Sequence, residues 1–593
     1  MPLTIVTFLL FVLKAFVVVM FAMNVAVILT WADRRQGAMI QDRVGPNRAV
    51  AWIPTFAAQG LALGPALAVV ALVGFVLLKL EPPPEELGQR AMLFSQLGIL
   101  FTWLTGVVIA GKVQTRGVTN SFDAWLLSLG DPRRIFYAGL FFHFAALFVG
   151  LALNDSAFGA QVRDIGYGGG AGLLVLSVLF GAGYAAFSIR NEPRIGLRLA
   201  GLLHPAADGL KTIFKEDFIP PNADKFLHSL APFISFFPAL VVMAVIPFGD
   251  TLCFSMAKGG GFGDLISTAP PGGVCTEAAM RLQVVDLDVG LLYFFALAGT
   301  GIVGAAIAGW ASDNKYSLLG GVRAASQMVS YEVTMGLTLV GAVMIYGDLR
   351  VDKMIAWQQQ NAWGIFVQPV AFFLFFTASV AESKRIPFDI PEGESEIVAG
   401  YFTEYAGMKF AMFFFAEYIA VVTSSGLMSA MFLGGWDLPF LSYSGLHVKI
   451  GETLLLDQAL PRVAVVVIGA LGFVLKTLTL CWLQLMIRWT LPRFRYDQLM
   501  RLGWRKLLPA SLGNIVVTGA IVMGIVSGGP EVAKFFALLA DYSKAFVALA
   551  GLGGFIFFVV WLVKPVHKRK TLSSSSAQYA TAAGGTRSAR MSA

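Results

Sequence analysis

Uninterrupted apolar runs long enough to cross a lipid bilayer dominate the chain. A helix of about 20 apolar residues spans the hydrocarbon core, and only helices satisfy the backbone in lipid over runs this long. The sequence therefore predicts an all-α, polytopic membrane protein with about 13 transmembrane helices. The runs lie near 3–31, 59–80, 92–112, 135–153, 170–188, 230–249, 289–310, 327–346, 364–382, 408–432, 463–488, 510–528 and 543–563.

Charged residues make up only 13% of the chain, against about 25% in soluble proteins. The net charge of +8 is concentrated in alternate loops, as the positive-inside rule requires. This pattern predicts an N-out, C-in orientation in a bacterial inner membrane and argues against a nucleic-acid partner. The basic loops contain Arg34–Arg35, Lys112–Arg116, Arg133–Arg134, Arg190–Lys215, Lys384–Arg385, Arg488–Lys506 and Lys564–Lys570.

Cysteine and histidine are too sparse to form a metal site. The three cysteines form no CxxC pair and the five histidines give no recognisable ligand set, so we expect no zinc or iron–sulfur centre bound by this chain alone. Cys253 and Cys275 share a predicted outer loop and could form a disulfide; two unpaired thiols are the alternative. Cys481 lies in a span and is expected to be a free, buried thiol.

Four predicted inner segments carry far more polar detail than a tether needs: 31–48, 201–221, 382–405 and 492–509. These segments and the adjoining helices contain seven motifs, which in their order resemble those of the quinone-chamber membrane subunit of respiratory complex I, the proton-pumping NADH:quinone oxidoreductase. The resemblance covers about 1–48 and 196–528. The motifs are QDRVGPN at 41–47, ADGLK with KED over 207–217, GWAS with SYE over 309–332, RIPFDIPEGESE at 385–396, TEY at 403–405, EY at 417–418 and PRFRYDQL at 492–499.

The resemblance implies a subunit without a redox centre of its own. It would form most of the chamber for its quinone substrate, contact the peripheral-arm and membrane-arm subunits and lipid, and couple quinone reduction to proton pumping. An equivalent subunit of a membrane-bound hydrogenase and a stand-alone cation/proton antiporter are the alternatives. The residues that the resemblance assigns to the chamber and its coupling are Arg34, Arg43, Asp208, Lys211, Arg323, Glu332, Glu382, Arg385, Phe388, Asp389, Glu392, Glu394, Glu396, Glu404 and Glu417.

The chain departs from the family pattern in three places. Asp33 stands where the family usually has Glu, about 150 residues interrupt the pattern after the GPN motif, and one helix extends past the family's usual end. Because the interruption contains four predicted spans, the chain returns to the same side, and we expect a peripheral four-helix module. The predicted divisions are a first helix with its loop (1–48), the insertion (49–194), the core bundle (195–528), an extra helix (529–570) and a disordered tail (571–593).

The acidic segment 382–405 sets six carboxylates against only Lys384 and Arg385. Carboxylates this close cannot all ionise cheaply, so the sequence predicts that some share protons and titrate together; a solvated acidic loop is the alternative. Glu332 and Glu417 fall inside apolar spans, where an ionisable group indicates function, although either could simply be a packed carboxylic acid.

The basic residues and the aromatic one also have structural alternatives. Arg34, Arg43 and Arg323 could each anchor the chain to anionic lipid. A rigid Gly-Pro turn follows Arg43, which suggests that this guanidinium pairs with a loop carboxylate. Phe388 suits the wall of a quinone tunnel, but it could equally be a core residue.

Overall fold

The computed structural model describes residues 2–41, 46, 51–54, 194–197, 203–254, 278–442, 445–450, 453–459, 462–527, 542–543, 545–547, 549, 551 and 553. The chain divides into two compact units. One comprises residues 1–47 and 204–549, and the other comprises residues 48–203 and 550–593. The four spans predicted within 49–194, the tail and most of the extra helix lie outside the described residues.

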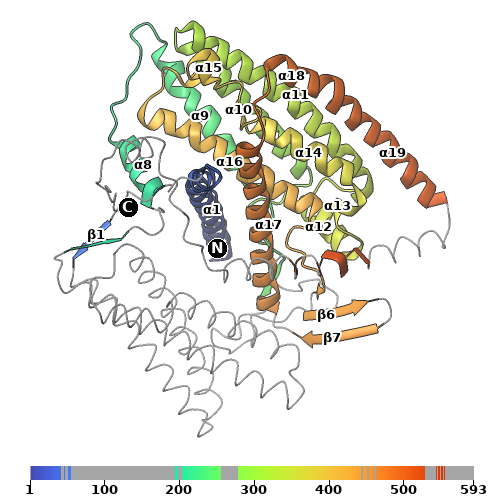
Figure 1. Ribbon diagram of the computed structural model, residues 1–593. Coiled ribbons are helices and arrows are strands. Elements are labelled where there is room, and N and C mark those ends of the chain that lie inside the picture. Colours follow the sequence, from blue (N-terminus) through green and yellow to red (C-terminus); the bar gives the residue numbers. More distant parts are fainter. Residues whose placement is uncertain are drawn as a thin grey trace, which may run out of the picture. The chain divides into compact units, whose positions relative to one another are not determined.

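Helices make up most of the described chain (Figure 1). In the first unit the long ones are α1 (Pro2–Ile40), α9 (Lys225–Val241), α10 (Gly290–Ala311), α11 (Lys315–Tyr346), α16 (Gly407–Phe432), α17 (Arg462–Thr490) and α19 (Leu508–Ser527). The shorter ones are α8 (Leu203–Ile213), η2 (Val242–Val245), α12 (Val351–Gln360), α13 (Gly364–Val367), α14 (Pro369–Glu382), α15 (Glu394–Ile397), η3 (Gly400–Phe402), α18 (Tyr496–Leu502) and the π-helical turn η4 (Gly503–Leu507).

Seven helices in the described part of the chain are long and apolar enough to cross a membrane: 11–38, 225–245, 290–311, 315–346, 407–432, 465–490 and 496–525. Each overlaps one of the predicted spans, which confirms the helical membrane class. The total of about 13 stays a prediction, because the insertion is not described.

Two predicted spans differ from the observed helices. The span predicted at 364–382 is broken at Gln368 into α13 and the 14-residue α14. Pro369, which has no backbone N–H, begins the second piece. At 1.5 Å per residue, α14 is too short to cross about 30 Å of hydrocarbon alone. The span predicted at 327–346 begins instead at Lys315, where the Asn314 side chain caps the helix. Its first turns contain polar residues, so hydropathy does not include them in the apolar run. Glu332 therefore lies mid-helix rather than one or two turns from the start.

Short antiparallel strands occur only between helices in the described residues. β3 (Leu252–Phe254) pairs with β4 (Ala278–Met280), and β5 (Leu441–Ser442), β6 (Gly445–Ile450) and β7 (Thr453–Ala459) form a three-stranded sheet. In the second unit, β1 (Ala51–Pro54) pairs with β2 (Arg194–Leu197) in the register Ala51↔Leu197 and Pro54↔Arg194. The two ends of the predicted insertion are therefore hydrogen-bonded to each other.

The acidic segment between α14 and α16 is seated against α11 through a very close backbone approach. A Cβ on Gly320 of α11 would lie 2.5 Å from the Tyr401 nitrogen, and a Cβ on Gly400 would clash with the Pro391 carbonyl oxygen. Gly400 also has φ +57°, a conformation that costs glycine little. Glycine at these two positions lets the segment fold against the bundle, where its charged side chains meet the helices.

Candidate functional site

The acidic segment does not form a solvated loop. The side chains of Lys384, Arg385, Phe388 and Asp389 are all less than 9% exposed. Phe388 stacks on Phe494, with ring centroids 5.4 Å apart. Burying this many charges is costly unless they pair with one another or change protonation. The part of the segment from Lys384 to Asp389 is therefore an ionisable part of the protein interior.

Glu417 of α16 is a buried carboxylate that contacts charged and polar groups of the acidic segment. It is 4% exposed, and its Oε2 lies 3.6 Å from Nη2 of Arg385. Tyr401 donates its hydroxyl to Oε1 of Glu417 at 3.1 Å and accepts a hydrogen bond from Nζ of Lys384 at 2.7 Å. The predicted intramembrane acid Glu417 thus has two direct partners, Arg385 and Tyr401, and both come from the acidic segment.

Backbone strain marks Lys384. Its φ is +53°, in the left-handed region, which costs a non-glycine residue about 1–3 kcal/mol and is found preferentially at functional sites. Its backbone N–H donates to the Ala381 carbonyl at 3.3 Å, just past the end of α14. The sharp turn places the ammonium and the neighbouring Arg385 guanidinium in the interior rather than in solvent.

Two further carboxyls of the segment resist ionisation. Burial raises the pKa of the Asp389 carboxyl to about 6, although Arg493, 2.8 Å from its Oδ2, opposes the rise. Burial also raises the pKa of Glu392 well above its ordinary value, and the nearby carboxylates of Glu417 and Asp389 raise it further. This agrees with the expectation that carboxylates of the segment titrate as a coupled group.

Asp33 connects this cluster to the first helix. Its carboxylate is 5% exposed, accepts hydrogen bonds from Tyr418 at 3.0 Å and Trp489 at 2.8 Å, and pairs with Arg488. The Arg385 guanidinium carbon lies 3.9 Å from the centre of the Tyr418 ring. Despite being shorter than the Glu usual in the family, Asp33 reaches both α16 and α17.

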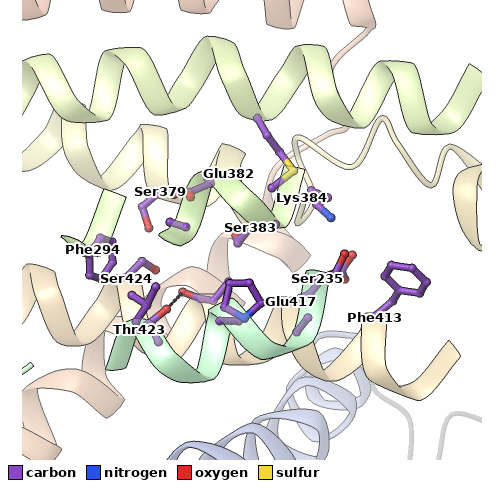
Figure 2. Close-up of a pocket in the computed structure, with 18 residues that line it drawn as sticks. Ser235, Phe294, Ser379, Glu382, Ser383, Lys384, Phe413, Glu417, Thr423 and Ser424 are labelled. Atoms are coloured by element: carbon purple, nitrogen blue, oxygen red, sulfur yellow. Dashed lines mark hydrogen bonds between the residues drawn. The ribbon is translucent and has the colours of Figure 1, made fainter. Parts of the chain in front are cut away.

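A cavity of about 70 Å³ borders the cluster, with Glu382, Lys384 and Glu417 in its wall (Figure 2). Hydroxyl groups of Ser379 on α14 and Thr423 on α16 also line it. A buried water needs about 10–15 Å³ of such space and several polar partners. The cavity therefore has the volume and the lining to hold several water molecules beside two acids and one base.

Glu332 of α11 lies close to α10. A Cβ on Gly299 would be 2.8 Å from Oε1 of Glu332, so the small residue leaves room for the carboxylate. Glu332 also acts electrostatically on Glu382. Glu382 in turn lines the cavity together with Glu417.

The other predicted residues lie apart from Glu417. Arg34 pairs with Asp208 at 2.5 Å, and each side chain is about half exposed, at 49% and 47%. Lys211 of α8 is exposed. Glu396 accepts a hydrogen bond from Arg323 at 2.8 Å.

Glu404, at the end of the acidic segment, accepts a hydrogen bond from Asn314 at 2.7 Å. Arg43, Cys275 and the side chains of Glu394 and Cys253 lie outside the described residues, so the predicted disulfide and the predicted partner of Arg43 stay predictions. Cys481 is a free, buried thiol, as expected.

Several residues of the cluster were not among those predicted. Tyr401 gives no signal in the sequence, because its role depends on how the segment folds back. In the sequence, Lys384 stands out only as one of the two cations among the carboxylates of the acidic segment. Tyr418 and Arg493 stand out only as members of motifs. Arg488 ends an apolar helix, and Asp33 was noted only as a departure from the family pattern. A search for ionisable residues at the ends of spans would have found the last two.

Fold and site together define a helical, multi-span membrane protein whose interior holds coupled acids and bases. The family model described as NADH dehydrogenase matches residues 173–519. One of the NADH-quinone oxidoreductase H subunits of Geobacter sulfurreducens is 41% identical over 382 residues, covering 63% of this chain and 99% of that protein. An H subunit of Geobacter metallireducens is 44% identical over 353 residues (58% and 92%), and an H subunit of Cytophaga hutchinsonii is 42% identical over 335 residues (56% and 88%). The chain belongs to the NADH dehydrogenase family that includes these H subunits.

Proposed function

We propose that this chain is the H subunit of a proton-translocating NADH:quinone oxidoreductase, forming most of the quinone chamber and coupling quinone reduction to proton movement. The observation that carries the proposal is the buried Glu417 with Arg385 and Tyr401 around it. A charge change at the acidic segment would reach Glu417 through contacts of 3.1–3.6 Å. Glu382 and Glu332 extend the ionisable groups from there into the bundle.

Quinone is the substrate in this proposal. A quinone site needs apolar walls and a few polar groups at the head. The electrons would come from redox centres in a peripheral-arm partner, which would dock on the polar inner segments. Reduction would alter the charge near Asp389 and Glu392, whose burial already opposes ionisation, and the shifted populations would propagate to Glu417.

The same proposal sets the chain in a bacterial inner membrane with its N-terminus outside and its C-terminus inside. Membrane-arm subunits and lipid would cover its apolar flanks. Residues 49–194 would form a separate module that contacts lipid or a neighbouring subunit, and the helix near 543–563 would be an addition to the core. The paired strands β1 and β2 support this division, because they close the insertion at its base.

Purifying the tagged, full-length chain in mild detergent tests the assignment. We expect subunits of an NADH:quinone oxidoreductase to co-purify, with quinone-dependent NADH oxidation. A chain that purifies alone or as a homo-oligomer would instead indicate an antiporter, and co-purification with a hydrogenase would indicate the other alternative.

Single Gln substitutions at Glu392, Glu394 and Glu396 test the coupling role. They should lower quinone-dependent NADH oxidation or its proton yield, while NADH oxidation with an artificial acceptor, which bypasses quinone, should survive. Asp288→Asn is the matched control, because the Asp288 side chain is 91% exposed. Full quinone activity and full pumping in all three Glu variants would refute the coupling role.

A further inference from the structure

Lys384 connects the acidic segment to the cavity. Its side chain is 7% exposed, it belongs to the cavity wall together with Glu382 and Glu417, and its strained backbone holds it there. Figure 2 shows Lys384 near the end of α14, on the same cavity as Glu417. A buried ammonium in contact with a cavity that can hold several water molecules is placed to exchange a proton as well as to neutralise charge.

The hydrogen bonds around Lys384 run in one direction. Its Nζ donates to the Tyr401 hydroxyl oxygen at 2.7 Å, and the Tyr401 hydroxyl donates to Oε1 of Glu417 at 3.1 Å. We propose that Lys384, Tyr401 and Glu417 form a proton relay. The ammonium gives a proton to the tyrosine oxygen while the tyrosine gives its own proton to the carboxylate. The ion pair thereby becomes a neutral amine and a neutral carboxylic acid, Tyr401 remains a phenol, and the net charge of the three groups does not change.

The groups around Lys384 act on its ammonium in opposite directions. Burial lowers the pKa of the Lys384 ammonium below its ordinary value, and Arg385 lowers it further, whereas Glu417, Glu392 and Glu382 oppose this. The Arg385 guanidinium, with Nη2 3.6 Å from Oε2 of Glu417, adds a fixed positive charge beside the carboxylate.

Arg385 follows Lys384 directly in the chain, so a shift of the acidic segment that moves its guanidinium away from Glu417 would drive the proton toward the carboxylate. Lys384 would then be an amine facing the cavity, ready to take a proton from water there. The coupling of this step to quinone chemistry rests on the proposed function, but the proton transfer itself does not.

The substitution Lys384→Arg separates a relay from a fixed positive charge. Arginine keeps the charge and can keep a hydrogen bond to Tyr401, but it does not release its proton in proteins. In the assembled complex we expect Lys384→Arg, Lys384→Met and Tyr401→Phe each to lower quinone-dependent NADH oxidation by about 100-fold, the usual size of an acid–base contribution. Tyr346→Phe is the matched control, because it removes a buried hydroxyl that donates only to the Met431 carbonyl. A wild-type rate in Lys384→Arg or in Tyr401→Phe would overturn the relay.

An infrared measurement tests the proton transfer without requiring turnover. The carbonyl band of a protonated carboxylic acid is assigned to Glu417 by its loss in Glu417→Gln and followed with pH in the purified complex. We expect this band in the wild type, its loss in Lys384→Arg and its retention in Tyr346→Phe. An unchanged band in Lys384→Arg would refute the relay even if the complex oxidised NADH with quinone. A complex lacking quinone activity but showing the expected bands would refute only the proposed function.

Discussion

Replacing Asp33 by Ala should destabilise the protein far more than an equivalent change in the neighbouring exposed ion pair. Asp33 of α1 pairs with Arg488 and accepts hydrogen bonds from Tyr418 and Trp489 at 3.0 and 2.8 Å. The substitution would leave a guanidinium, a phenol and an indole N–H without their common acceptor. It therefore tests whether this carboxylate holds α1 against α16 and α17.

The size of the effect follows from the burial of the pair. Removing one partner of a buried ion pair costs about 3–5 kcal/mol, mostly because the other charge is left unpaired. The Arg488 side chain is 23% exposed, so water can solvate part of the orphaned guanidinium. We therefore expect a loss near the lower end, about 3 kcal/mol.

Asp208→Ala provides the comparison within the same structure. Asp208 forms an ion pair with Arg34 of α1. In this pair the side chains of Arg34 and Asp208 are 49% and 47% exposed. Such a pair contributes about 0–1 kcal/mol. Heating the purified complex and following the loss of this chain from it should give a much larger fall in midpoint temperature for Asp33→Ala than for Asp208→Ala. Equal shifts would refute the reasoning that burial makes the Asp33 pair important.

Three further outcomes are expected. Because the pKa of Asp389 is raised to about 6 in the folded protein, its stabilising contribution is complete when the pH is below the ordinary pKa of aspartate, and it is lost as the pH rises through 6. The thermal stability of the wild type should therefore fall over this pH range, and that of Asp389→Asn should not. A fall that persists in the variant would contradict the assignment. Replacing residues 55–193 by Asn-Gly would join Pro54 to Arg194, which are already paired, as a two-residue hairpin; the shortened complex should still reduce quinone, and an assembled variant that cannot would refute a peripheral role for the insertion. If Cys253 and Cys275 form a disulfide, worth about 3 kcal/mol by loop closure, alkylation should label both only after reduction, and labelling without reductant would exclude the bond.

The sequence predicts the seven described spans because hydropathy over about 20 residues is a local property. It misplaces the start of α11 because Lys315 and Arg323 interrupt the apolar run while the helix continues through them. It also misses the break at Gln368, since the apolar residues on both sides read as one run. Hydropathy thus predicts where an apolar helix lies better than it predicts where that helix begins, ends or breaks.

The site shows the same limit at the level of single contacts. Glu417 could be singled out from the sequence because a carboxylate inside an apolar run is rare. Its partners could not, because Tyr401 reaches it only when Gly400 and Gly320 let the segment fold against α11. Composition predicted that the acids of the segment interact, whereas the particular pairs depend on contacts between residues far apart in sequence.

The Asp33–Arg488 pair joins residues 455 positions apart, and this has a consequence for how the protein is made. A ribosome adding about 5–20 residues per second needs roughly 20–90 s to cover that interval. Throughout this time the first helix is already synthesised, while the arginine that neutralises its aspartate does not yet exist. The contacts that hold α1 against α17 can therefore form only near the end of translation, after Arg488 has been synthesised.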